Sequence, residues 1–326
     1  MNKPFVSISC VTFNHEPYIR QCLDGFMMQE CDFDFEILIH DDASTDKTQA
    51  IIKEYVLKYP DIIKPIYQTE NQWSKTTGGM NAHYNFPRVK GKYVAMCDGD
   101  DYWTDPKKLQ KQVDFMEANL DCIMCYHSVK NVFMAKNKKD KIIDLNTATN
   151  LKFTSEEFIK TKYARTVTQF FRSQVIINYP KWTLESPIGD YPLQMLCAVN
   201  GNIGYIGGEP MAVYRVGVSG STNDGRFGSK EEQKQWVRKR LYNHKKSRDL
   251  FNENSNYKYN HIIQQEKQKF SFGMLNQGLD NFNKVEMFKL FKKYIPYPLK
   301  MEWKYLRFWV RFLLGPKTFD SLKKRI

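Results

Sequence analysis

Residues 92–101 read Lys92-Tyr93-Val94-Ala95-Met96-Cys97-Asp98-Gly99-Asp100-Asp101, a β-prone run that ends in three carboxylates. The apolar part predicts a buried strand, which places the carboxylates at its carboxyl end, where open α/β sheets bind ligands. Three carboxylates within four residues repel one another, and solvent, protonation or a bound cation must relieve that repulsion. The run therefore predicts either a divalent-cation site or an acidic surface turn.

Strand-like and helical patterns alternate before this acidic stretch. Strands are predicted at residues 5–12, 35–40 and 62–67, and apolar residues at helical spacing predict a helix after each of the first two. Asp46 and Gln49 fit a capping box at the start of the second helix. The β-α-β-α-β order predicts an α/β fold with a mostly parallel central sheet flanked by helices.

The pattern continues after the acidic stretch. A helix is predicted to begin at Pro106, and single strands are predicted at residues 122–132 and 166–171. A short helix capped by Thr154 or Ser155 lies between these strands. Seven cysteines are an odd number spread through core-like segments, so we expect reduced, buried thiols.

Charge divides the chain into two parts. Residues 227–326 hold 23 Lys and Arg against 9 Asp and Glu, a net charge of +14, whereas residues 1–226 have a net charge of −1. We therefore predict a near-neutral catalytic domain over residues 1–226 and a basic, largely helical C-terminal region over residues 227–326. Such asymmetry is typical of an appendage that meets a polyanion or an anionic membrane.

A basic stripe in the C-terminal region favours the membrane. Lys300, Lys304, Arg307 and Arg311 lie on one face of a helical projection, with Trp and Phe residues around them. A basic amphipathic helix of this kind is typical of an anionic membrane interface. The alternative is a helix that packs on the catalytic domain with its basic face in water. Nucleic acid is not expected, because no recognised binding module accompanies the charge.

The sequence gives no sign of a membrane span or a signal peptide. No run of 18 apolar residues is present, and the first residues lead directly into strand-like sequence. We therefore expect a cytoplasmic protein that is peripheral on the inner face of the cell membrane.

Three runs, taken in order, resemble the family 2 glycosyltransferases, which are inverting enzymes with the GT-A fold. They are Val6-Ser7-Ile8-Ser9-Cys10-Val11-Thr12-Phe13-Asn14, Glu36-Ile37-Leu38-Ile39-His40-Asp41-Asp42-Ala43-Ser44-Thr45-Asp46, and Gly91-Lys92-Tyr93 through Asp98-Gly99-Asp100-Asp101-Tyr102-Trp103 to Pro106. The resemblance covers residues 4–216. It implies a GT-A domain in which residues 1–102 bind the nucleotide sugar and residues 103–226 bind the acceptor.

The resemblance also implies a metal and donor site. Asp98 and Asp100 match the D-x-D element, which would hold Mn²⁺ or Mg²⁺ against the donor diphosphate, with one carboxylate near the ribose and Asp101 assisting. A hard cation suits carboxylate and phosphate oxygens. Asp41 or Asp42 would accept from a ring N–H of the base, in a pocket lined by Thr12, Phe13 and Asn14. The alternatives are a strand-end turn for Asp42 and helix capping for Ser44-Thr45-Asp46.

Asp190 is the predicted catalytic base. Gly189-Asp190-Tyr191-Pro192-Leu193-Gln194 resembles the acidic motif that opens a late helix of the family's catalytic domain, and transfer with inversion needs a base for the acceptor hydroxyl. The alternative role is a helix N-cap, and both roles are compatible. Tyr214-Arg215-Val216-Gly217 resembles part of a Tyr-Arg-x-His element, but Gly217 replaces the His. Arg215 is then either a diphosphate contact or a structural arginine.

These features predict a metal-dependent inverting glycosyltransferase. It would move a sugar from a nucleotide-sugar donor, UDP-linked as the commonest choice, to a hydroxyl of a glycan or lipid-linked acceptor in surface polysaccharide synthesis. A sugar nucleotidylyltransferase is one alternative, although residues 12–17 lack a Gly-rich basic phosphate loop. A non-catalytic, membrane-associated scaffold with the same fold is the other, and the presence of Asp98, Asp100 and Asp190 argues against it.

Overall fold

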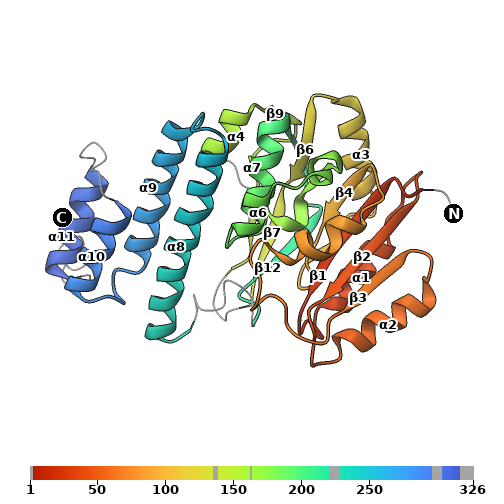
Figure 1. The fold of residues 1–326 in the computed structure, drawn as a ribbon, viewed down its shortest axis with the longest axis horizontal. Coiled ribbons are helices and arrows are strands. Elements are labelled where there is room, and N and C mark those ends of the chain that lie inside the picture. The colour runs from red at the N-terminus through yellow and green to blue at the C-terminus, as the bar shows by residue number, and fades with distance from the viewer. Residues whose placement is uncertain (1–2, 135–138, 162–163, 220–227, 296–302, 316–326) are drawn as a thin grey trace. The chain divides into compact units, whose positions relative to one another are not determined.

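The computed structural model describes residues 3–134, 139–161, 164–219, 228–295 and 303–315. The chain divides into two compact units, Met1–Val218 and Ser219–Ile326. Figure 1 shows that the first is an α/β unit, whereas the second is helical throughout its described part.

An eight-stranded sheet forms the centre of the first unit. Its first four strands are parallel in the order β3-β2-β1-β4, with the bounds Ile63–Tyr67, Phe35–Asp41, Val6–Thr12 and Tyr93–Met96. The order continues as β10-β6-β11-β9, with the bounds Phe170–Arg172, Cys122–His127, Asn202–Ile206 and Leu151–Phe153. β10 and β9 are antiparallel to their neighbours, and β6 and β11 are parallel. The expected mostly parallel sheet is confirmed. Its first four strands lie within residues 1–102 and its other four within residues 103–226.

Helices flank this sheet because each has an apolar face. In α1 the buried side chains are Ile19, Cys22, Leu23 and Phe26, which recur at one-turn spacing. The α-helices of the first unit are α1 Ile19–Met27, α2 Thr48–Lys58, α3 Lys108–Ala118, α4 Ser155–Thr161, α5 Gln174–Ile177, α6 Lys181–Glu185 and α7 Asp190–Asn200. Short π and 3₁₀ turns lie at η1 Asn81–Asn85, η2 Phe86–Arg88 and η3 Thr166–Thr168.

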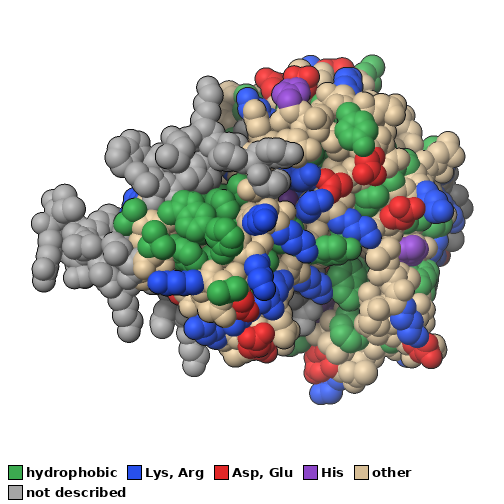
Figure 2. All heavy atoms as spheres, turned by 60° about the vertical axis from the view of Figure 1, so that its left-hand side comes forward, with side chains coloured by type: hydrophobic (Ala, Val, Ile, Leu, Met, Phe, Trp, Pro, Cys, Tyr) green, Lys and Arg blue, Asp and Glu red, His purple; other side chains and the backbone are tan. Residues whose placement is uncertain are grey.

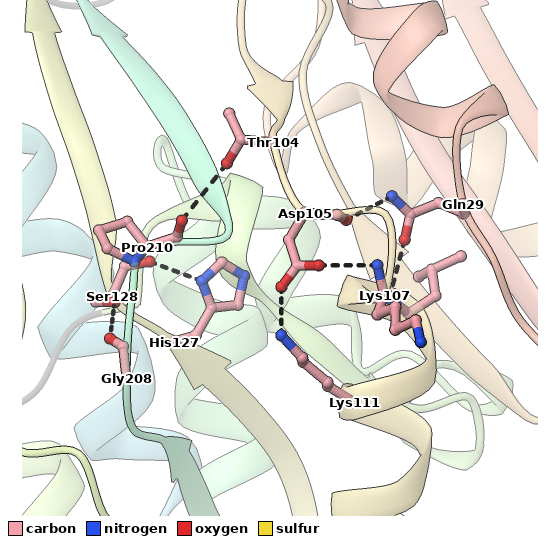
Figure 3. Close-up of polar contacts among 10 residues, drawn as sticks. Gln29, Thr104, Asp105, Lys107, Lys111, His127, Ser128, Gly208 and Pro210 are labelled. Carbon is pink, nitrogen blue, oxygen red and sulfur yellow. Dashed lines mark hydrogen bonds and ion pairs between the residues drawn. The ribbon is translucent and has the colours of Figure 1, made fainter.

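The single strand expected at residues 122–132 is wrong. The chain leaves β6 at Ser128, and β7 (Val129–Phe133) joins a second sheet in the order β5-β12-β7-β8, whose other strands are Tyr102–Trp103, Ala212–Val216 and Lys141–Ile143. The Ser128 hydroxyl donates to the Gly208 carbonyl at 3.0 Å, which fixes the change of sheet (Figure 3). Both parts have β propensity, so periodicity gave no sign of the break.

Two further expectations about local structure are wrong. Residues 166–168 form η3 instead of strand, because the Thr168 hydroxyl donates back to the Arg165 carbonyl at 2.8 Å. The capping box of Asp46 and Gln49 does not form, because α2 begins at Thr48. The side-chain amide of Gln49 donates to the Asp41 carboxylate at 2.6 Å. Asp46 accepts from the Thr48 and Glu16 amides instead.

The start of α3 is tied to the end of α1. Asp105 accepts from the Lys107 amide at 2.8 Å and from the Lys111 ammonium, and its carbonyl accepts from the Gln29 side chain at 2.9 Å (Figure 3). Gln29 also accepts from the Leu109 amide at 3.0 Å. These bonds hold the segment that follows the acidic stretch, and α3 begins at Lys108 instead of Pro106.

The second unit consists of α8 Lys230–Asn254, α9 Asn260–Gln277, α10 Lys284–Tyr294 and α11 Trp303–Leu314. Capping boxes start α8 at Ser229 and α10 at Asn283. A core of its own contains Leu241, Leu275, Met287 and Phe308, all at most 2% exposed. Among the described residues, no helix is both long and apolar enough to cross a membrane.

Candidate active site

The acidic stretch lies at the carboxyl end of β4, directly against the end of β1. The Gly99 amide donates to the Val11 carbonyl at 2.9 Å. A Cβ on Gly99 would lie 2.6 Å from the Thr12 hydroxyl and 3.0 Å from His15 Nδ1. Only glycine allows this close approach, so the short residue between Asp98 and Asp100 brings both carboxylates to the edge formed by the first strand.

Asp98, Asp100 and Asp190 share one electrostatic environment. Burial, together with the negative charges of Asp100 and Asp190, raises the pKa of Asp98 to about 8. Asp190 begins α7, so the structure brings a residue from late in the unit to the end of β4. Gly189 is the N-cap of α7 and Asp190 is its first residue, so the N-cap role expected as an alternative does not apply.

Asp101 and Arg215 form a buried structural pair. Asp101 is fully buried, and one of its carboxylate oxygens accepts from the Arg215 backbone amide at 2.8 Å. The Arg215 guanidinium donates to the Asp100 carbonyl and to Gln21, and it lies between the rings of Tyr18 and Tyr102. Its position is therefore set by protein groups, and it fixes the backbone that carries the acidic stretch.

The carboxylate oxygens of the acidic stretch are suitable ligands for a divalent cation. The second carboxylate oxygen of Asp101 is buried and has no hydrogen-bond partner in the described part of the chain. Burial, with the charges of Asp100 and Asp190, raises the pKa of Asp98, and a bound cation would offset this cost of ionising the carboxylate. The described residues contain no preformed group of three ligating side chains. A site with one or two carboxylates suits Mg²⁺, which takes its remaining ligands from water and substrate phosphates.

Asp41 and Asp42, which were expected to accept a hydrogen bond from the nucleotide base, already accept hydrogen bonds from protein groups. Asp41 accepts from the Ser44 amide and hydroxyl and from Gln49. Asp42 accepts from the Gln72 amide at 2.7 Å and from the Trp73 amide at 3.0 Å. Both carboxylates are almost completely buried. Asp41 and Asp42 therefore fix the loops that follow β2 and β3 at this edge of the sheet.

Two residues with exposed aromatic rings, Phe13 and Trp73, lie next to backbone groups that are tied to Asp42. The Asp42 amide donates to the Thr12 carbonyl at 2.9 Å, so Asp42 is anchored beside the turn that carries Phe13. Phe13 is 38% exposed and Trp73 is 47% exposed. The Thr12-Phe13-Asn14 turn is held by Asn14, which has a φ of 53° and accepts from the Thr45 amide at 2.8 Å.

Two further residues of this edge, His15 and Trp73, were not among the residues expected at the site. The ring of His15 is 3.1 Å from the Thr12 hydroxyl, and burial lowers its pKa although Asp100 and Asp46 oppose this. Its place directly after the Thr12–Asn14 turn was the available signal. No sequence motif includes Trp73, and its position became evident only from the hydrogen bond that its backbone amide donates to the Asp42 carboxylate.

A contact between two loops supports the start of α7. The Gly78 amide donates to the Ser186 carbonyl at 2.8 Å, and the Thr77 hydroxyl donates to the Leu184 carbonyl at 2.6 Å. A Cβ on Gly189 would lie 2.9 Å from the Cα of Gly79. The loop after β3 therefore packs backbone to backbone against the residue that precedes Asp190.

Comparison with known sequences identifies related proteins. The family model described as glycosyl transferase family 2 matches residues 7–177. Two uncharacterised proteins, from Mycobacterium tuberculosis and Mycobacterium bovis, are 35% identical over 214 residues, which is 64% of this chain and 58% of theirs. The match thus spans less than two thirds of these relatives. A Bacillus subtilis protein named as the teichuronic acid biosynthesis glycosyltransferase TuaG is 33% identical over 114 residues, 35% of this chain and 42% of its own.

Comparison with solved structures identifies the fold. Residues 1–349 of Staphylococcus aureus TarS, solved in complex with UDP-GlcNAc, match with a TM-score of 0.53. The match covers 95% of this chain and 92% of the TarS chain at 16% identity. The two chains therefore share a fold.

Proposed function

This chain belongs to glycosyl transferase family 2 and has a GT-A-like fold, and we propose that it is a glycosyltransferase that transfers a sugar with inversion from a nucleotide-sugar donor to a hydroxyl group. The acceptor in this proposal is a glycan or a lipid-linked sugar of surface polysaccharide synthesis, because TuaG carries a name from that chemistry. The observation that supports the proposal most is the proximity of the acidic residues: Asp190, after burial and Asp100, is one of the causes that raise the pKa of Asp98, so its carboxylate is close enough to interact with the acidic stretch.

The donor in this proposal is a UDP-sugar. TarS has the same fold and was solved with UDP-GlcNAc, which makes that compound the first donor to test. The nucleotide base of the donor would lie near the Thr12–Asn14 turn. The exposed rings of Phe13 and Trp73 are suited to stacking on it. Asp41 and Asp42 would shape this pocket through the loops that they hold. Each carboxylate already accepts hydrogen bonds from protein groups, so an N–H of the nucleotide base would be an additional donor to it.

Asp98 and Asp100 are the carboxylates that would hold Mn²⁺ or Mg²⁺. When bound, the cation neutralises the nucleoside diphosphate that leaves. Asp101 would contribute less directly, because its backbone bond to Arg215 fixes the loop. Arg215 would act in the same way, by holding the Asp100 carbonyl, instead of reaching the diphosphate itself.

Asp190 would act as the general base. A carboxylate accepts the proton of the acceptor hydroxyl as that oxygen attacks the anomeric carbon, from the face opposite the diphosphate. Asp190 is the first residue of α7, so the start of this helix sets the position of the carboxylate.

The two alternatives differ in the product they would form. A nucleotidylyltransferase would release pyrophosphate, and family membership argues against it. A scaffold would release nothing. The deciding experiment incubates the chain with a panel of nucleotide sugars and Mn²⁺ and measures free nucleoside diphosphate. Release from one donor, dependent on the divalent cation, supports the proposal; no release from any donor with an acceptor extract present would refute it.

A lipid-linked acceptor would place the reaction at the cytoplasmic face of a membrane. Such acceptors are held in the bilayer by their lipid, so an enzyme that stays at the surface meets them more often than one in free solution. The net charge of +14 over residues 227–326 supports this location. A nucleic-acid partner has no support from the fold.

A further inference from the structure

The second unit carries an exposed apolar face on α10 and α11. Val285 and Phe288 of α10 are 63% and 58% exposed, and Leu313 of α11 is 62% exposed. The Lys284 ammonium lies 3.5 Å from the Leu313 carbonyl oxygen, so the start of α10 lies beside the end of α11. Singly exposed apolar side chains are common on folded proteins, but Val285 and Phe288 lie one turn apart on α10, at the end of the helix that adjoins Leu313, and a group of this kind is typical of an interaction site.

An aromatic cluster centred on the buried Phe308 holds these two helices together. Phe308 is 2% exposed, and its ring is 5.7 Å from that of Phe291 and 6.2 Å from that of Phe312. The rings of Phe291 and Trp309 are 4.8 Å apart. Because this cluster fills the space between the helices, Val285, Phe288 and Leu313 are held on the outer side.

Unpaired cations accompany the apolar face. Lys284, Lys289, Lys292 and Lys293 of α10 are exposed, and within the described residues none of them forms an ion pair. The single acid of α10, Glu286, pairs with Lys234 and Arg238 of α8 instead. Figure 2, which brings this side forward, shows apolar side chains gathered beside Lys and Arg side chains.

The expected basic stripe is only partly described. Arg307 is exposed, and Arg311 pairs with Asp280 at 3.7 Å. Lys300 and the side chain of Lys304 lie outside the described residues. The positive charge that the structure shows on this surface therefore comes mainly from α10, which the sequence stripe did not include.

We propose that α10 and α11 form a docking surface for a membrane that contains anionic phospholipids. Val285, Phe288 and Leu313 enter the boundary between headgroups and acyl chains, and the lysines of α10 lie among the lipid phosphates. The combination of exposed apolar side chains and unpaired lysines on one helix fits this interface, where one layer is apolar and the next is anionic. The proposal is independent of the donor and of the catalytic base.

Other occupants fit less well. A second copy of the chain would bring the lysines of two α10 helices together, and like charges at an interface oppose association. Nucleic acid would use the lysines but leave Val285, Phe288 and Leu313 without a role.

Vesicle flotation of the full chain tests the proposal. The double variant Val285→Ser with Phe288→Ser removes exposed groups only, so the unit should still fold. The matched control is Leu57→Ser with Leu120→Ser, two side chains of the first unit that are 84% and 76% exposed. With vesicles of equal phosphatidylcholine and phosphatidylglycerol, we expect the first variant to lose about tenfold or more in partitioning and the control to match the wild type.

A charge variant and three opposing outcomes complete the test. Lys289→Gln with Lys292→Gln should weaken binding to the mixed vesicles and reduce its dependence on salt, with little effect on pure phosphatidylcholine. Equal partitioning of wild type and the Val285→Ser, Phe288→Ser variant would overturn the proposal. So would binding of a DNA oligonucleotide that is as tight as vesicle binding and survives this variant, or a dimer in light scattering that the variant abolishes.

Discussion

Gly79 and Gly189 meet backbone to backbone: a Cβ on Gly189 would lie 2.9 Å from the Cα of Gly79. Gly79 follows β3 and has a φ of 79°, whereas Gly189 directly precedes Asp190. The neighbouring bonds from Gly78 to Ser186 and from Thr77 to Leu184 reinforce the contact. A loop of the half that is proposed to bind the donor thereby supports the residue proposed as the general base.

Gly189→Ala should lower turnover more than it lowers donor binding. Gly189 has a φ of −79°, which alanine adopts without strain, so the added methyl acts through its contact with Gly79. A shift of the α7 start by a few tenths of an ångström should reduce kcat by about tenfold or more. Steady-state kinetics and calorimetric binding of the donor nucleotide measure the two effects separately.

Gly273→Ala is the matched control for this variant. Gly273 lies in α9, and a Cβ there would meet no atom within 4 Å. This control should retain wild-type kinetics. An equal loss of nucleotide binding and turnover in Gly189→Ala would show that the contact supports the whole site instead of Asp190.

Asp190→Asn should keep the fold and donor binding but lose most transfer activity. Asparagine has the same shape but does not take up the acceptor proton, and loss of a general base costs about 10² to 10⁴ in rate. Product formation from labelled donor, together with a thermal unfolding curve, measures both properties. Turnover near that of the wild type would remove Asp190 from the proposed mechanism.

Asp100→Ala should abolish the part of nucleotide binding that depends on a divalent cation. The carboxylates of Asp98 and Asp100 would no longer act together on the metal, while the loop stays held by Asp101 and Arg215. Calorimetry with UDP, with and without Mn²⁺, gives the comparison. A binding enhancement by Mn²⁺ equal to that of the wild type would contradict the metal assignment.

Strands and acidic residues were predictable from sequence because their signals are local. The apolar runs of β1, β2 and β4, and the carboxylates at the ends of β2 and β4, lie within short windows, and the parallel order places the strand ends together. The contact between Gly79 and Gly189 joins distant segments, and no periodicity encodes it. The same holds for the bond between Asp42 and Trp73 and for the break at Ser128, where one β-prone run enters two sheets.

A pH dependence of stability should arise from Lys108. This side chain is fully buried, its ammonium donates to Gln112 at 2.7 Å, and it lies 3.9 Å from the centre of the Trp103 ring. Burial lowers the pKa of Lys108 to about 7. In the unfolded chain the group keeps its proton to about pH 10.4, so the unfolded state binds more protons between these values. The contribution of Lys108 to the free energy of unfolding therefore rises with pH from about 7 upward.

Lys108→Met removes this titration. Between pH 7 and pH 9, we expect the wild type to gain about 2 kcal/mol in unfolding free energy relative to the variant. Urea unfolding at both pH values measures the difference, which cancels titrations common to the two proteins. Lys111→Met is the control on the same helix, because Lys111 is half exposed in its ion pair with Asp105 and should leave the pH slope unchanged. Parallel profiles for the wild type and Lys108→Met would show that the Lys108 ammonium stays charged within the core.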